Sequence, residues 1–210
     1  MIDFSTILCK FWLTEKFFMS TYYAQPSDHV SSKIPYFYRV DTKSISFADQ
    51  IISYNEFLFF TSNVEKLSLY KTIVKNEDAT IFPLEKIIEL LPAIKDFYFY
   101  DNPGFKLITK NTAKELLKIP HFSTIEEFYM YFVPEIFDIE TFYAYIKTNK
   151  YTKIKVEFSD KISEDYKIRV EQIIDEIIGT ENHEYNVPRI VFQGLAEEKM
   201  HKMRSLFGYF

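Results

Sequence analysis

One short apolar pattern returns several times between residues 63 and 158, and no other feature of the chain constrains its fold as strongly. In each copy, an apolar residue is followed by two residues of any kind, a second apolar residue, one residue of any kind and a third apolar residue. The four clearest copies begin at Val64, Ile94, Ile125 and Tyr151. Their fourth positions lie 30, 31 and 26 residues apart, with a helix-like segment between consecutive copies. Self-similarity at such a period is typical of repeat architectures.

The segments between the copies carry only one apolar stripe each. In residues 84–91, the apolar side chains follow the spacing of a single helical face. One strand–helix unit cannot bury that stripe alone, whereas parallel units stacked side by side share a core between a strand layer and a helix layer. Such connections also satisfy the right-handed crossover preference. The sequence therefore predicts an α/β solenoid of about five to six irregular repeats, with parallel strands on the concave side and helices on the convex side.

Weaker copies of the pattern begin at Thr42 and Val187, so the predicted repeats extend towards both ends. Residues 1–23 are apolar and aromatic with a spacing that predicts a helix followed by a short extended piece, and 34–40 reads as an irregular strand. We therefore divide the chain into an N-terminal helical segment, 1–30, and an α/β domain, 31–210. The expected helices of that domain are 48–60, 84–91, one starting at Asn111, 134–149, 163–178 and 196–207.

Side chains alternate across a strand, so each copy of the pattern has an inward and an outward set. The fourth and sixth positions are expected in the core: Leu67, Leu69, Phe97, Phe99, Phe128, Met130, Ile154 and Val156. The third, fifth and seventh positions form columns on the other side, which also align Arg189 with Lys153 and Val191 with Lys155. The centre of those columns is a block of tyrosines flanked by charges, and its residues are Tyr70, Asp96, Tyr98, Tyr100, Glu127, Tyr129, Tyr131, Lys153 and Lys155.

This outward block has two interpretations. Tyrosine offers a large contact area, little rotamer entropy and a hydroxyl group, and it is enriched in protein interfaces, so the block could dock a protein or peptide. Alternatively, the rings stack on one another as a ladder that stabilises the sheet. The two roles are compatible. The chain holds 22 Phe and 16 Tyr, so aromatic side chains must be interpreted by position and not by number.

A family resemblance rests on the copy that begins at Ile94. The pattern Ile94-x-x-Phe97-x-Phe99-x-x-Asn102 resembles the leucine-rich-repeat signature with aromatic replacements, and only this copy holds the ladder asparagine. The whole of 42–207 is similar to the irregular repeats of F-box proteins that are numerous in nematodes. Residues 5–13 resemble the end of an F-box, whose Leu-Pro-rich first helix is absent here. The resemblance implies substrate recognition in a ubiquitin ligase, with an adaptor contact through residues 1–20.

Several classes of function are disfavoured by composition and spacing. The net charge of −5 lacks the concentrated positive field that nucleic-acid binding needs. No apolar run suggests a membrane span or a secretory signal, and a single cysteine, Cys9, fits a reducing compartment, so we expect an intracellular protein, cytoplasmic or nuclear. Cys9 lies among apolar residues and is expected to be buried and inert. The four histidines lack metal-ligand spacing, so no metal or cofactor site is expected.

The sequence therefore favours a protein-interaction module that is not an enzyme and whose target is an unknown protein or peptide. Two alternatives remain open. One is a divergent enzyme with a dispersed site, which a histidine such as His121 or His183 beside a carboxylate in a deep pocket would favour. The other is a truncated F-box relative that acts as a stand-alone binding scaffold.

Overall fold

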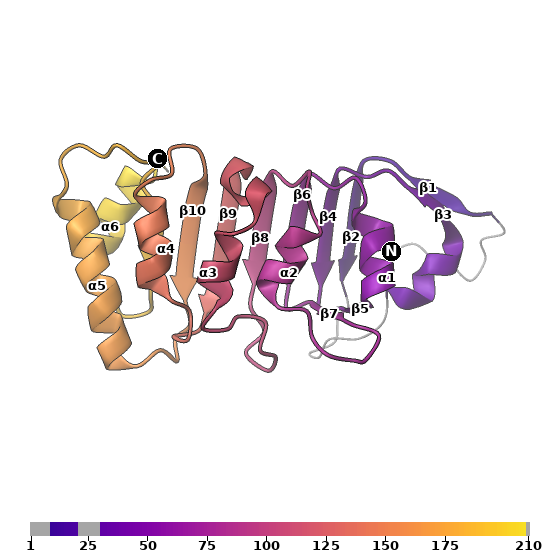
Figure 1. Cartoon of the computed structure of the whole chain (residues 1–210), viewed down its shortest axis with the longest axis horizontal. Helices are drawn as coiled ribbons and strands as arrows, with labels where there is room; N and C mark the ends of the chain where they lie inside the picture. Colours follow the sequence, from indigo (N-terminus) through magenta and orange to yellow (C-terminus); the bar gives the residue numbers. More distant parts are fainter. Residues whose placement is uncertain (1–8, 21–29, 209–210) are drawn as a thin grey trace.

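A seven-stranded sheet runs along the structure, a computed structural model that describes residues 9–20 and 30–208 (Figure 1). Its strands lie side by side in the order in which they occur in the chain, and every neighbouring pair is parallel. They are β2 (Lys16–Ser20), β4 (Ser44–Ala48), β6 (Lys66–Tyr70), β8 (Asp96–Tyr100), β9 (Glu127–Val133), β10 (Lys153–Phe158) and β11 (Arg189–Val191). The predicted α/β class with parallel strands is confirmed.

Most helices connect successive strands and lie against one face of the sheet, which Figure 1 shows most clearly for α2, α3 and α4, whereas α6 follows the last strand. They are α1 (Tyr54–Thr61), α2 (Leu84–Glu89), α3 (Thr112–Leu116), α4 (Ile139–Ile146), α5 (Glu164–Gly179) and α6 (Glu197–Leu206), with 3-10 turns η2 (Ser31–Tyr36) and η3 (Pro120–Thr124). Two small parallel pairs stand apart from the main sheet: β1 (Phe11–Leu13) with β3 (Phe37–Val40), and β5 (Ile51–Ser53) with β7 (Ile73–Lys75). Within the described ranges, no helix has the length and apolar character needed to cross a membrane.

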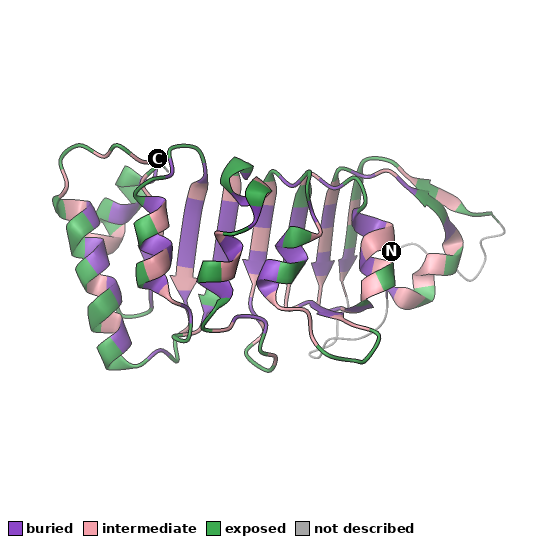
Figure 2. Cartoon of the chain, viewed as in Figure 1, coloured by how far each residue is buried: buried purple, intermediate pink, exposed green. Residues whose placement is uncertain are grey.

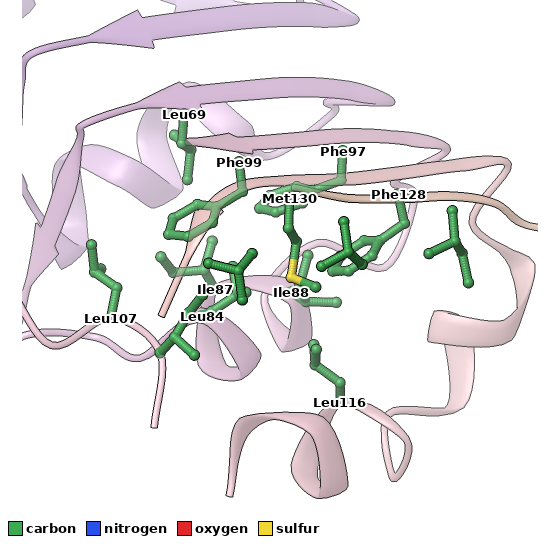
Figure 3. Packing of buried hydrophobic residues seen from close by; sticks show 14 of the residues in the cluster. Leu69, Leu84, Ile87, Ile88, Phe97, Phe99, Leu107, Leu116, Phe128 and Met130 are labelled. Carbon is green, nitrogen blue, oxygen red and sulfur yellow. The ribbon is translucent and has the colours of Figure 1, made fainter. Parts of the chain in front are cut away.

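The core lies between the sheet and the helices. All eight residues predicted to point inward from the strands are buried, with at most 1% of their surface exposed, so the predicted alternation is confirmed for β6, β8, β9 and β10. Phe97 stacks on Phe128 with ring centroids 5.7 Å apart, and Figure 3 shows both rings directed towards the apolar side chains of α2 and α3. Exposed and buried stripes alternate along the helices, as a single apolar face requires (Figure 2).

Side chains at the strand ends hold neighbouring turns together. Gln50, Thr72 and Asn102 each lie two residues beyond the end of a strand. Gln50 donates through Nε2 to the carbonyl oxygen of Ala48 at 2.9 Å, and Asn102 donates through Nδ2 to that of Lys71 at 3.4 Å. Thr72 accepts from the Gln50 backbone N–H at 3.3 Å. A polar residue thus occupies the same position in three successive turns, although only one of them is asparagine.

Replacing Thr72 with valine tests this role. Thr72 is fully buried, and its hydroxyl also donates to the carbonyl oxygen of Phe47 at 3.1 Å. The isosteric change removes both bonds and leaves buried backbone groups unsatisfied, so the free energy of unfolding should fall by about 1–3 kcal/mol. Denaturant unfolding measures the loss. The exposed Thr148→Val variant is the control, and equal stability of the two variants would contradict the role.

Of the helix and the short extended piece predicted for residues 1–23, the helix is wrong for the residues that the structure describes. Residues 11–13 and 16–20 form β1 and β2, and β2 pairs with β4 in the main sheet. Phe17 and Met19 point inward beside Ile45 and Phe47, whereas Phe18 between them is exposed. A continuous run of apolar residues fits both a helical and a strand period, which is why the sequence pattern misled here. Residues 1–8 and 21–29 lie outside the described ranges.

Three further boundaries differ from the predictions, and the first is the expected strand 34–40, which begins only at Phe37 after η2. The expected helix 48–60 begins only at Tyr54, because β4 extends to Ala48, β5 occupies 51–53 and the capping box of Ser53 and Glu56 starts α1. The expected helix 134–149 likewise begins at Ile139, after its N-cap Asp138.

The register of the last strand also differs by two residues. Arg189 lies beside Lys155, and Val191 beside Glu157, instead of beside Lys153 and Lys155. A slip of two residues keeps every side chain on its own face, so the apolar pattern cannot exclude it.

Candidate functional site: the tyrosine face

The nine residues predicted as a binding surface all lie on strands β6, β8, β9 and β10 and alternate there with the core residues. We call this set the tyrosine face. Neighbouring strands place these nine residues in three rows, which Lys66, Ser68 and Glu157 complete. The first row is Lys66, Asp96, Glu127 and Lys153; the second is Ser68, Tyr98, Tyr129 and Lys155; the third is Tyr70, Tyr100, Tyr131 and Glu157. The structure therefore brings the predicted residues together.

The third row is an aromatic stack with a lysine at each end. The rings of Tyr100 and Tyr131 lie parallel with centroids 4.1 Å apart, and Tyr70 is tilted against Tyr100 at 5.0 Å. The ammonium group of Lys71 lies 5.4 Å from the Tyr70 ring, and that of Lys155 lies 4.2 Å from the Tyr131 ring. Such contacts stabilise neighbouring strands. The three tyrosines remain half-buried, so the stack is also open to solvent.

Charged and hydroxyl groups form a connected network over the first two rows. Lys66 donates to the Asp96 carboxylate at 3.2 Å and to the Tyr98 hydroxyl at 3.3 Å. The Tyr98 hydroxyl in turn donates to Glu127, and the Tyr98 ring meets Tyr129 edge to face at 5.1 Å. The predicted stabilising ladder and the predicted contact surface are therefore built from the same side chains.

Charged side chains that lie just before neighbouring strands form a row of ion pairs. Lys43 and Lys95 bind opposite oxygens of the Glu65 carboxylate at 2.9 and 2.7 Å. The hydrogen bonds from Lys95 and Lys43 lower the pKa of Glu65 to about 2. Glu65 therefore stays ionised at any physiological pH, and the edge of the sheet beside the tyrosine face has alternating charges.

Two members of the tyrosine face are covered. Tyr129 has only 3% of its surface exposed and Lys155 only 9%, so the prediction that they are available as contact residues is wrong for this conformation. The ring of Phe207, at the end of α6, lies 6.0 Å from the Tyr129 ring, and the Lys153 ammonium lies 4.7 Å from the Phe207 ring. Lys155 forms an ion pair with Glu157 at 3.1 Å. The sequence pattern of the strands could not reveal the contact over Tyr129, because it comes from the end of a distant helix.

Two exposed aromatic residues extend the face, and the sequence prediction missed both. Phe132 follows Tyr131, is 42% exposed and lies 6.5 Å from the Tyr100 ring. It has a left-handed backbone with φ of 60°, which turns it out of the strand's alternation. Phe18 is 68% exposed and continues the second row on β2 beside Ser46, and it was missed because β2 was predicted to be helical.

No protein-family model, no curated protein and no solved structure matches this chain. The candidate site therefore rests on geometry alone.

Groups that could support chemistry elsewhere have ordinary partners. His121 contacts the carbonyl oxygen of Ile88 at 2.8 Å, and His183 contacts that of Ile177 at 3.0 Å. Neither contact is with a carboxylate. Cys9 is exposed, so the expectation of a buried thiol is wrong. Over residues 9–20 and 30–208, no three His, Cys, Asp or Glu side chains gather in a way that could hold a metal ion.

Two shallow pockets of about 420 and 360 Å³ lie away from the tyrosine face. The larger is lined by residues such as Glu135, Tyr166 and Arg169, and the smaller by Glu65, Lys95 and Glu126, among others. No member of the tyrosine face lines either of them.

Proposed function

We propose that the protein is a protein-interaction module that recognises a protein or peptide with its tyrosine face, as a leucine-rich-repeat-like solenoid does with its strand side. By resemblance, this activity is substrate recognition in an F-box-type ubiquitin ligase. The observation that carries the proposal is the half-buried aromatic row of Tyr70, Tyr100 and Tyr131, which is in register across three strands and open to solvent.

The repeat interpretation is supported by connectivity and by the turns. Each successive unit adds one parallel strand next to the previous one. The turn residues Gln50, Thr72 and Asn102 occupy equivalent positions and bond to backbone groups of their own or a neighbouring turn. Stacking of each unit against the next is what a solenoid requires.

The chemistry of the face supports a protein partner. Tyrosine rings that are held by stacking lose little entropy when a partner binds, because they are already ordered. Lys66, Asp96 and Glu127 lie at the border of these rings and are bonded to their neighbours, as is common for the polar rim around an interface core. The partner is therefore expected to be a folded surface or an extended peptide with complementary aromatic and polar groups.

Capture with serine variants tests the proposal. Tyr70→Ser and Tyr100→Ser together remove two of the three tyrosines of the aromatic row, and specific partners identified by mass spectrometry should be depleted at least about tenfold. Tyr151→Ser is the matched control, because Tyr151 is 83% exposed and lies outside the tyrosine face. Circular dichroism verifies that all variants are folded. Undiminished capture by the double variant would refute the proposed surface.

The contact with a ubiquitin-ligase adaptor is independent of partner recognition by the tyrosine face. Residues 11–13 and 16–20, within the segment 1–20 for which the resemblance implies an adaptor contact, form strands. Co-purification with a ubiquitin-ligase adaptor distinguishes a ligase subunit, which binds it, from a stand-alone binding scaffold, which does not. Recognition through the tyrosine face is expected in either case.

A further inference from the structure

The last helix covers one end of the tyrosine face. Because Tyr129 alternates with the core residues Phe128 and Met130, its ring points away from the helix layer that packs on the core. Phe207 nevertheless contacts that ring and is itself only 5% exposed. The end of α6 therefore lies on the opposite side of the sheet from the core, over part of the proposed binding surface.

The helix is weakly attached compared with its neighbour. Among the residues of α6 only Met203 is buried, whereas α5 buries five side chains. Lys199 of α6 forms ion pairs with two residues of α5, Glu171 at 2.7 Å and Asp175 at 2.5 Å. Ion pairs at a surface contribute little to stability. Elements with few buried apolar contacts open at lower free-energy cost than the rest of a fold.

The chain also provides a pivot before the helix. Gly194, between β11 and α6, has φ of 98°, and a side chain placed there would have no neighbour within 4 Å. Glycine adopts this left-handed conformation without the penalty that other residues incur. Rotation about this position could therefore move α6 without disturbing the parallel sheet.

We propose that α6 is a displaceable cover of the tyrosine face, and that a binding partner inserts an aromatic side chain in the place of Phe207, against Tyr129 and beneath the Lys153 ammonium. The arrangement of Phe207 indicates the chemistry that the site accepts: an aromatic ring that meets a tyrosine and a cation at once. The identity of this occupant rests on the proposed function, whereas the cover itself does not.

Nitration of tyrosines by tetranitromethane, read by peptide mass spectrometry, tests the cover in the full chain. Tyr129 should resist nitration in the parent and react in the Phe207→Ala variant, with a rate increase of at least about tenfold. Tyr151 is the internal control and should react equally in both. A gentler variant, Lys199→Ala, keeps the packing of Met203 and should give a smaller increase. Rapid nitration of Tyr129 in the parent, or none in either variant, would overturn the cover.

A peptide supplied in trans tests the occupant. A synthetic peptide of residues 196–208, added to the full-length Phe207→Ala chain, should protect Tyr129 from nitration, and the same peptide with Phe207→Ala should need at least about tenfold higher concentration. Equal protection by both peptides, or by neither, would overturn the assigned aromatic occupant. Loss of capture through Tyr70 and Tyr100 is measured independently, so a failure of the proposed function and a failure of the cover give different results.

Discussion

Replacing Phe97 with alanine is expected to lower the free energy of unfolding by about 3–5 kcal/mol. The Phe97 ring is fully buried and stacks between Phe128, at 5.7 Å, and Phe99, at 6.4 Å. Its removal leaves a cavity between the strand layer and the helix layer, which the close-packed neighbours fill only in part. Denaturant unfolding followed by circular dichroism measures the change.

The matched control is Tyr151→Ala, which also truncates an aromatic side chain. Tyr151 is 83% exposed, so its loss should change stability by no more than about 0.5 kcal/mol. A similar effect of the two substitutions would show that the assignment of inward and outward faces is wrong, because a shift of one residue exchanges them.

Asp101 is expected to produce the largest dependence of stability on pH. It follows β8 and has only 3% of its surface exposed. Its Oδ1 atom is buried without a hydrogen-bond partner among the residues that the structure describes. Burial raises the pKa of Asp101 to about 7, although a hydrogen bond from the Asn102 backbone opposes the shift. The carboxyl group is therefore near its midpoint at neutral pH.

The sign of the effect follows from the direction of this shift. The folded-state pKa exceeds the unfolded value of about 3.9, so the folded chain holds a proton that the unfolded chain has released. The resulting stability is complete below about pH 4 and is lost as the pH rises towards 7. Between pH 5 and pH 8, the parent should lose about 2–3 kcal/mol more than the Asp101→Asn variant, in which the side chain stays neutral.

Unfolding by urea at both pH values measures this difference. Every other titrating group is shared by the two proteins, so subtracting the variant's change from the parent's isolates Asp101. The variant should also be the more stable of the two at pH 8. Parallel changes in the two proteins would mean that the carboxylate is hydrated or paired in solution.

The alternation of apolar residues correctly predicted which side chains of the central strands point into the core. Period-two spacing in β6, β8, β9 and β10 was enough to assign Phe97 and its equivalents to the inward face and Tyr98 and its equivalents to the outward face. This works because one face of each strand must be buried in the core. The start of α5 was predicted correctly from Ser163, which caps the helix, whereas the caps Ser53 of α1 and Asp138 of α4 were not recognised. These features depend on residues that are close in sequence.

Features that depend on distant contacts were missed. The strand β2 could not be distinguished from a helix, because its apolar residues fit the spacing of a helix as well as that of a strand. Pairing with β4, which is distant in sequence, decides its conformation. The slip of β11 leaves its face unchanged, so no pattern marks it. The cover over Tyr129 comes from Phe207, far along the chain, and only the folded structure places the two rings together.

Site-specific photo-crosslinking tests the central claim most directly. A benzophenone-bearing amino acid is placed at Tyr100, in the middle of the half-buried aromatic row, and in a second protein at Tyr151, which lies outside the tyrosine face. If the tyrosine face recognises a protein, irradiation in cell extract should link the Tyr100 protein to a discrete partner that the Tyr151 protein does not capture. Identical crosslinking patterns from the two positions, or no crosslink from Tyr100, would contradict it.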